Sequence, residues 1–208
     1  MNVIAINGSP RKDGNTYTVL KAMAEELEKE QIHTEIIQVG DQMIHGCIAC
    51  RYCRKSEQNH CVFKDDIVNE IADKMREADG FILGSPTYFG GIAGTMKSFL
   101  DRLFSTSGRY FKGKVAAVVA VARRAGAVET INQMTNYLRL SQTVIPPSQY
   151  WAGVYGAEKG EALQDEEGMQ TARRNAQAMV WLLKAIYESK DQIHAFRDEA
   201  KIMTNFIR

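Results

Sequence analysis

The four cysteines of this chain lie close together, between positions 47 and 61 of 208 residues. Their spacing is Cys47-x2-Cys50-x2-Cys53-x7-Cys61. Thiolates at such short intervals are ligands for zinc or for iron-sulfur clusters. Three thiols at successive two-residue gaps, with a fourth a short loop away, suit the separate irons of a four-iron four-sulfur cluster better than a tetrahedral zinc site. Zinc, and thiols that are unliganded or redox-active, remain as alternatives.

A polar loop at residues 7–16 has the composition of an anion site. It follows a short apolar run and leads into an amphipathic stretch, so its last residues would open a helix, where the N–H groups and the helix dipole favour an anion. Donors are available from Ser9, Arg11, Asn15 and Thr16. The loop lacks both Gly-x-Gly-x-x-Gly and Gly-Lys-Ser/Thr, so it predicts a phosphate site that is neither a dinucleotide fingerprint nor a triphosphate loop. The alternative is a simple turn in which Asn15 or Thr16 caps the helix.

A third segment, residues 84–91, combines aromatic and small residues after another apolar run. Two aromatic side chains and several backbone N–H groups would suit a planar heterocycle. The residues expected at such a ring are Pro86, Thr87, Tyr88, Phe89 and Gly90. The alternative for the two aromatics is ordinary packing over the end of the core. Another turn, which contains Arg123 and Gly126, would close a third side of the site.

These segments must be positioned by the elements around them, and apolar runs alternate with amphipathic stretches along the chain. Strands are expected near residues 3–6, 34–39, 81–83 and 115–122, with a fifth between 143 and 155, and helices between and after them. This alternation predicts an α/β, flavodoxin-like, doubly wound domain with a five-stranded parallel sheet, order 2-1-3-4-5, and helices on both faces. Ligands bind beyond the carboxyl ends of such strands. The 7–16 loop, the 84–91 segment and the turn with Arg123 and Gly126 would meet there.

One domain is expected over residues 1–188, with the cysteine loop at 46–61 as part of it. The tail at 189–208 has no complete helical stripe but carries several apolar residues. We expect this tail to pack on the domain or at a subunit interface.

Composition excludes several classes of protein. Lys plus Arg number 26 and Asp plus Glu 25, a net charge of +1, which argues against a nucleic-acid partner and against a strongly acidic electron carrier. The longest uncharged apolar run, residues 115–122, is far shorter than the roughly 20 residues of a membrane span. With no membrane segment or export signal expected, the predicted compartment is the cytoplasm.

The 7–16 loop and the 84–91 segment, together with Met96-Lys97 and Asp101-Arg102, resemble the NADPH-dependent FMN reductase branch of flavodoxin-like proteins. The match extends from residue 1 to about residue 126. It implies FMN, with its phosphate on the donors of the 7–16 loop and its ring along residues 86–90. Lys97, Asp101 and Arg102 are expected to form a structural ion pair or a helix-surface network.

The cysteine spacing resembles that of the iron-sulfur flavoproteins, a subgroup of the same branch. That resemblance implies a 4Fe-4S cluster on Cys47, Cys50, Cys53 and Cys61, and a homodimer or homotetramer in which the cluster of one subunit faces the FMN of another. The expected function is an FMN-dependent oxidoreductase that connects a donor, such as NAD(P)H or a reduced electron carrier, with a small-molecule or protein acceptor. The alternatives are a cluster-free NAD(P)H-dependent FMN or quinone reductase, a flavodoxin-like electron carrier, and a metal-binding regulator. No side chain is predicted to act as a catalytic acid or base.

Overall fold

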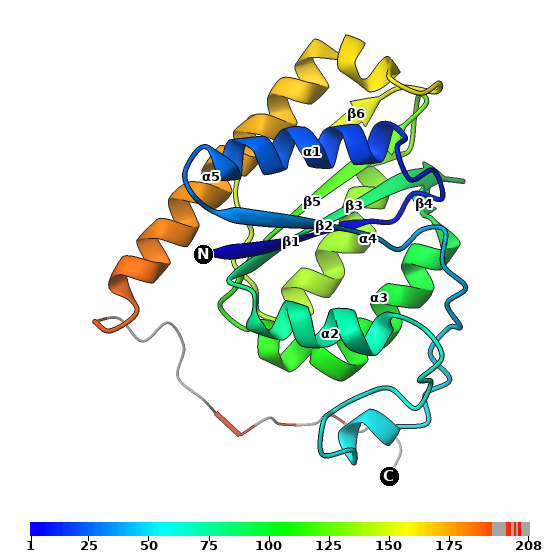
Figure 1. The fold of residues 1–208 in the computed structure, drawn as a ribbon, viewed down its shortest axis with the longest axis vertical. Helices are drawn as coiled ribbons and strands as arrows, with labels where there is room; N and C mark the ends of the chain where they lie inside the picture. The colour runs from blue at the N-terminus through cyan, green and yellow to red at the C-terminus, as the bar shows by residue number, and fades with distance from the viewer. Residues whose placement is uncertain (193–198, 201, 203, 205–208) are drawn as a thin grey trace.

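Strands and helices alternate along the chain in the computed structural model, which describes residues 1–192, 199, 200, 202 and 204 (Figure 1). The strands are β1 (Asn2–Asn7), β2 (His33–Gln38), β3 (Gly80–Tyr88), β4 (Gly91–Ile92), β5 (Val115–Ala122) and β6 (Gly153–Tyr155). The helices are α1 (Asn15–Glu28), α2 (Val68–Glu77), α3 (Gly94–Ser107), α4 (Ala127–Leu140) and α5 (Glu166–Ser189). Short 3-10 turns cover Tyr52–Arg54, Gly108–Phe111 and Glu161–Gln164.

The sheet has the predicted doubly wound topology. Its strand order is β2-β1-β3-β5-β6, and all neighbours on this path are parallel. This is the expected order 2-1-3-4-5, because β5 and β6 are the fourth and fifth parallel strands along the chain. One further strand was not predicted from the sequence pattern. The addition is β4, which pairs antiparallel with the end of β3 and lies off the main path. The last parallel strand is short, because the chain after α4 makes only an isolated bridge from Val144 to Val115 before β6 begins.

Helices cover both faces of the sheet and create two apolar cores. One core is formed with α1 and α5, and the other with α2, α3 and α4. In Figure 1, α1 and α5 lie on the opposite side of the strands from α2 and α3. All eight residues of β5 are buried, as expected for a central strand between two helical layers. The rigid sheet therefore fixes the loops at its carboxyl edge.

Two close approaches join those loops. The backbone N–H of Gly8, just after β1, donates to the carbonyl of Gly84 in β3 over 2.8 Å. A Cβ atom at Gly40 would lie 2.2 Å from the carbonyl carbon of Ser9, so only glycine allows the chain after β2 to pass the 7–16 loop. At the edge of the sheet that is predicted to bind ligand, the segments that follow neighbouring strands are therefore in close contact.

The C-terminal tail was expected to cover the domain or a subunit interface. Helix α5 ends at Ser189, and most of the tail lies outside the described residues, so that expectation stays a prediction. Across the described residues, no helix has both the length and the apolar character required to cross a bilayer.

Candidate functional site

The loop between β1 and α1 is shaped by two amide side chains. Asn7 accepts a hydrogen bond from the backbone N–H of Ser9 over 3.1 Å and donates to Gln38 Oε1 over 2.6 Å. Gln38, at the end of β2, donates to the carbonyl of Ser9 over 2.8 Å. The conformation of the loop is therefore set by the ends of the first two strands.

The N-terminus of α1 lacks the features that usually satisfy a helix start. Its N-cap is Gly14, no side chain caps the helix, and no acidic residue lies in its first turn. Thr16 is only 2% exposed, and its hydroxyl makes no hydrogen bond to the described residues. Among those residues, Asn175 Oδ1 is the one side-chain polar atom that is both buried and unpartnered, so the Thr16 hydroxyl keeps contact with solvent. Because the first N–H groups of a helix have no partner within the helix, this arrangement fits an anion such as a phosphate.

Asn15 and Arg11 both form hydrogen bonds to the loop after β6. The Asn15 amide donates to Glu158 O over 2.8 Å and accepts from the backbone N–H groups of Gly160 and Ala162. Arg11 donates to Ala157 O over 3.1 Å through one of its nitrogens. The Asn15 side chain is thus a link to the loop after β6, and its backbone N–H at the helix start is what it offers an anion.

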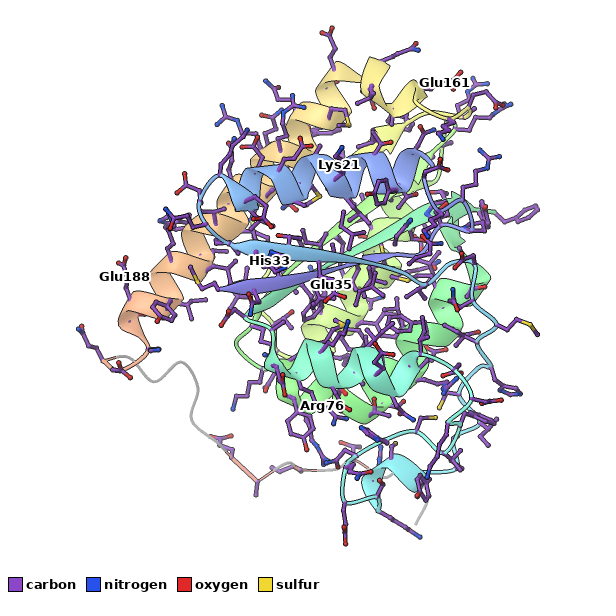
Figure 2. All side chains as sticks on the ribbon, in the orientation of Figure 1. Lys21, His33, Glu35, Arg76, Glu161 and Glu188 are labelled. Carbon is purple, nitrogen blue, oxygen red and sulfur yellow. The ribbon has the colours of Figure 1, made fainter. Side chains whose placement is uncertain are left out.

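The loop after β6 forms a fourth side of the candidate site, and the sequence pattern did not predict it. Glu161, at the top of the molecule in Figure 2, accepts hydrogen bonds from the backbone N–H groups of Ala157 and Glu158 over 2.7 and 2.9 Å. These bonds lower the pKa of the Glu161 carboxyl. They also fold the loop into the shape that meets Asn15 and Arg11. No local motif marks this segment, because its partners lie more than 140 residues earlier.

The proposed ring segment forms a tight hairpin between β3 and β4. Phe89 and Gly90 have φ values of 50° and 75°, the left-handed pair of a type I′ turn. Left-handed backbone is strained for an aromatic residue. Phe89 is completely exposed and Tyr88 is 48% exposed, so the alternative that Phe89 packs over the core is wrong. Pro86 and Thr87, closer to the sheet, are half-buried.

The loop after β5 closes against this hairpin as predicted from the sheet order. Gly126 has a φ of 89°, and a Cβ atom there would lie 3.1 Å from both the Gly90 Cα and the Thr87 Cγ2. Thr130 donates to the Thr87 hydroxyl over 3.0 Å. Arg123 is exposed and forms no ion pair with any residue that the structure describes. The 7–16 loop, the hairpin and the Gly126 turn therefore share one edge of the sheet.

The cysteine loop leaves that edge and runs beside α3. The four cysteines form no disulfide; Cys47 and Cys50 are exposed, and Cys53 and Cys61 are half-buried. Cys53 donates to Ser105 O over 3.5 Å, and the Cys47 Sγ lies 3.9 Å from the Ser105 Oγ. Burial raises the pKa of the Cys53 thiol, and the neighbouring thiols of Cys61, Cys47 and Cys50 raise it further. Cys53 therefore lies within electrostatic range of the other three thiols.

Arg102 anchors the loop to α3. Lys97 and Asp101 form an exposed ion pair, over 2.6 Å. Of the two expected alternatives, a structural ion pair or a helix-surface network, Arg102 forms the first, with a side chain that is fully buried. It pairs with the carboxylate of Asp66 and donates to Cys61 Sγ over 3.2 Å. An arginine on the buried stripe of α3, between Phe99 and Thr106, was the sequence signal that could have revealed this contact.

Helix α2 holds the same loop from the other side. The Asn69 amide accepts from the backbone N–H of Cys61 over 2.8 Å and donates to the carbonyls of Cys61 and Phe63. His60 pairs with Asp73 over 2.9 Å. Arg76, labelled in Figure 2, donates to Gln58 O over 2.9 Å. Sequence analysis missed these anchors, which restrain the segment carrying Cys61.

The thiols are not gathered around a single point. Within the described ranges of the chain, no three His, Cys, Asp or Glu side chains form a group suited to one metal ion. Three of the four thiols lie along the second half of α3, at Arg102 and Ser105. What the structure provides is a set of neighbouring thiols backed by a buried cation.

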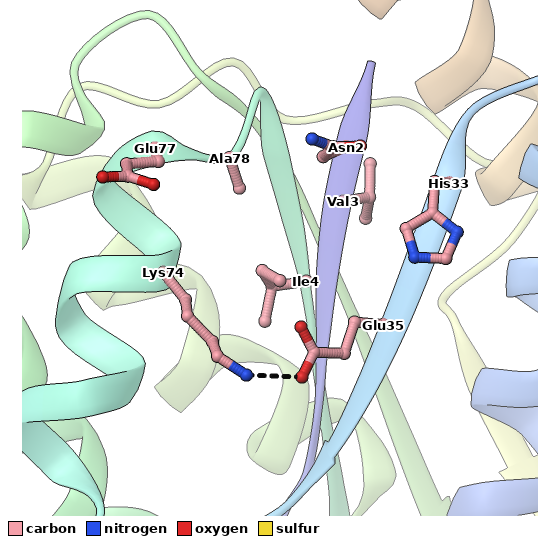
Figure 3. Close-up of a pocket in the computed structure, with 8 residues that line it drawn as sticks. All are labelled: Asn2, Val3, Ile4, His33, Glu35, Lys74, Glu77 and Ala78. Atoms are coloured by element: carbon pink, nitrogen blue, oxygen red, sulfur yellow. Dashed lines mark hydrogen bonds and ion pairs between the residues drawn. The ribbon is translucent and has the colours of Figure 1, made fainter.

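A hollow of about 210 Å³ lies elsewhere, beside the first residues of β1 and β2 (Figure 3). An ion pair between Lys74 and Glu35, 2.7 Å long, is part of its lining. Because this hollow is at the amino ends of the strands, it is separate from the edge that carries the 7–16 loop. It contributes none of the predicted site residues.

Comparisons with known proteins agree with this geometry. The model of the family described as NADPH-dependent FMN reductase matches residues 1–158. An iron-sulfur flavoprotein of Methanocaldococcus jannaschii is 36% identical over 194 residues, covering 89% of this chain and 99% of that protein. Another, from Methanosarcina thermophila, is 29% identical over 197 residues, covering 92% and 100%. The solved structure of RosB with bound 8-demethyl-8-formylriboflavin-5'-phosphate has a TM-score of 0.73 at 18% identity, covering 100% of this chain and 94% of that one, and shares the fold.

Proposed function

The chain belongs to the NADPH-dependent FMN reductase family, within its iron-sulfur flavoprotein subgroup, and from this premise we propose that it is an FMN-dependent oxidoreductase. It would transfer electrons between a donor, such as NAD(P)H or a reduced electron carrier, and a small-molecule or protein acceptor. The observation that carries this proposal is the uncapped start of α1, where the hydroxyl of Thr16 makes no hydrogen bond to the described residues and is open to solvent.

The phosphate of FMN would be held by donors at the start of α1. Ser9 is 5% exposed, and its Oγ accepts from the backbone N–H of Arg11 over 3.1 Å, which leaves the hydroxyl proton for an anion. Thr16 adds a second hydroxyl, Arg11 a cationic side chain, and Asn15 a backbone N–H. This set satisfies a doubly charged group without help from a bound metal.

The ring of FMN would lie between the hairpin and the Gly126 turn. The ring would lie close to the backbone of Pro86, Thr87 and Gly90. The exposed side chains of Tyr88 and Phe89 would be available to stack on it. Arg123, exposed at the same edge, would balance negative charge on the cofactor. Bound flavin accepts electrons in pairs and releases them singly, which suits it to connect a hydride donor with a one-electron acceptor.

Cys47, Cys50, Cys53 and Cys61 would hold a 4Fe-4S cluster. The chemistry of the donor set fits, because four thiols lie on one loop and form no disulfide. In this structure three of them contact Arg102 or Ser105, and the four are not gathered around one point. Thiols that remain reduced also fit the cytoplasm expected from composition.

The assembly proposed with this function is the homodimer or homotetramer that the resemblance implies. Ser105 is eleven residues beyond Gly94, about 16 Å along α3, so the thiols of Cys47 and Cys53 lie at the opposite end of this helix from the hairpin. Electrons would pass between the flavin of one subunit and the cluster of another.

The test is the cofactor content and reduction of anaerobically purified protein. We expect FMN, iron and sulfide in the wild type, with bleaching of the flavin absorbance by NADPH or NADH. In Cys50→Ala we expect the iron to be lost while FMN remains. Wild-type protein that keeps FMN but binds no iron after reconstitution would instead be a cluster-free FMN or quinone reductase. Protein that binds no FMN would refute the proposal.

A further inference from the structure

Arg102 is the most completely satisfied buried cation of the described chain. Its side chain has no exposed surface. An arginine has five N–H donors, and here each has an acceptor. Two go to the Asp66 carboxylate, the others to the carbonyls of His45 and Phe63 and to the sulfur of Cys61.

The guanidinium remains charged in this buried site. Arginine is not deprotonated in proteins, and the carboxylate of Asp66 balances its charge here. The ring of Phe63 lies 5.0 Å from the guanidinium carbon and covers it further. A full positive charge is therefore held in a region of low dielectric, where its influence on nearby groups is strongest.

We propose that Arg102 sets the reduction potential of the iron-sulfur cluster through its hydrogen bond to Cys61 Sγ and through its buried charge. This inference rests on the proposed function, since it requires the cluster. Within that function, it assigns Arg102 the role of a positioning and tuning residue that acts through a ligand.

The direction of the effect follows from the charge balance. One-electron reduction adds one negative charge to the cluster and its thiolates. A donor N–H at a ligand sulfur and a cation beside it favour that more negative state, so they raise the potential. The carboxylate of Asp66, 7% exposed, partly cancels the cation and opposes it. The two members of one ion pair should therefore shift the potential in opposite directions.

A structural role alone would give a different pattern. Removing either member of a buried ion pair disturbs the same contacts, so both changes would loosen the loop in the same way. Opposite shifts of potential therefore separate electrostatic tuning from simple support of the fold.

The experiment is a redox titration of the reconstituted protein, with the reduced cluster followed by its paramagnetic resonance signal. In Arg102→Gln we expect the one-electron equilibrium to shift about tenfold toward the oxidised state, which corresponds to a decrease of about 59 mV. In Asp66→Asn we expect an increase. Arg76→Lys is the matched control, because Arg76 bonds to Gln58 O and Asn59 O of the same loop but to no sulfur. Its potential should equal that of the wild type.

Folding of each variant is checked by circular dichroism and by FMN content. If Arg102→Gln does not fold, Arg102→Lys replaces it; the charge is kept and the Nε–Sγ hydrogen bond is lost, so the potential should still fall. Unchanged potential in the folded Arg102 variant, or shifts of the same sign for Arg102 and Asp66 variants, would overturn the inference. Wild-type protein without iron would refute the cluster itself, whereas iron with unchanged potentials would refute only the role of Arg102.

Discussion

Asn15, at the start of α1, accepts a hydrogen bond from the backbone N–H of Gly160 over 2.9 Å across 145 positions of sequence. The same amide bonds to Glu158 and Ala162. It thereby joins the 7–16 loop to the loop after β6. The contact shows that the candidate site is built from both ends of the domain.

Asn15→Ala should therefore reduce the stability of the protein. Three hydrogen bonds at about 1 kcal/mol each give an expected loss of about 2–3 kcal/mol in the free energy of unfolding. Urea unfolding of the apoprotein measures this, with Asn136→Ala on the exposed side of α4 as a control that should change little. Equal stabilities for the two variants would show that the Asn15 links are not formed in solution.

Thr16→Val should separate ligand binding from stability. Valine keeps the shape of threonine but removes the unpartnered hydroxyl, so the apoprotein should be as stable as wild type or slightly more stable. FMN binding should weaken by about 1.5–3 kcal/mol, the range for a hydrogen bond to a charged group. Quenching of flavin fluorescence gives the dissociation constants.

Thr18→Val is the matched control for that change. Thr18 lies on the same helix, but its hydroxyl donates to Gly14 O within the protein. Its FMN affinity should stay close to that of wild type. If Thr16→Val also kept wild-type affinity, the hydroxyl could not be a phosphate ligand.

Phe89→Asn should stabilise the apoprotein. Asparagine tolerates the left-handed backbone of a type I′ turn, whereas phenylalanine is strained there and its side chain is fully exposed. We expect a gain of about 1 kcal/mol by urea unfolding. Tyr88→Asn, at a strand position with ordinary backbone, should give no gain. A loss of stability in Phe89→Asn would show that this side chain packs against something in solution, such as a second subunit.

Stability at alkaline pH should depend on Tyr137. Burial and the hydrogen bond to Asp101 raise the pKa of Tyr137 to about 12. An unfolded tyrosine has a pKa near 10, so between about pH 10 and 12 the unfolded chain releases this proton while the folded protein keeps it. Stability should fall as pH rises through that window, and it should fall more steeply for wild type than for Tyr137→Phe. Parallel unfolding curves for the two proteins would contradict this assignment.

Much of the fold was predictable because runs of apolar residues indicate which segments of the chain are buried. The fully buried strand β5 coincides with the predicted run, and the strand order follows from the handedness of the crossovers. Strand β4 was missed because its turn depends on the backbone of Phe89, a residue type that rarely adopts positive φ. The short β6 was located only roughly, since three residues carry little pattern.

The site was predicted less completely than the fold. Loop positions follow from topology, so the convergence of the 7–16 loop, the hairpin and Gly126 was expected. The hydrogen bonds of a polar side chain, in contrast, depend on partners that are distant in sequence. Examples are the bonds between Asn15 and Gly160 and between Arg102 and Cys61. Hydrogen bonds of this kind leave no local pattern, which explains why the anchors of the cysteine loop were not foreseen.

The central claim, that the start of α1 binds the phosphate of a flavin, is tested most directly by comparing FMN with riboflavin. The two ligands share the ring and differ by the phosphate, so the difference in affinity reports on this one site. We expect FMN to bind about a hundredfold more tightly than riboflavin, as two or more hydrogen bonds to a charged group would give, with part of that ratio lost in Thr16→Val. Equal dissociation constants for FMN and riboflavin would contradict the account.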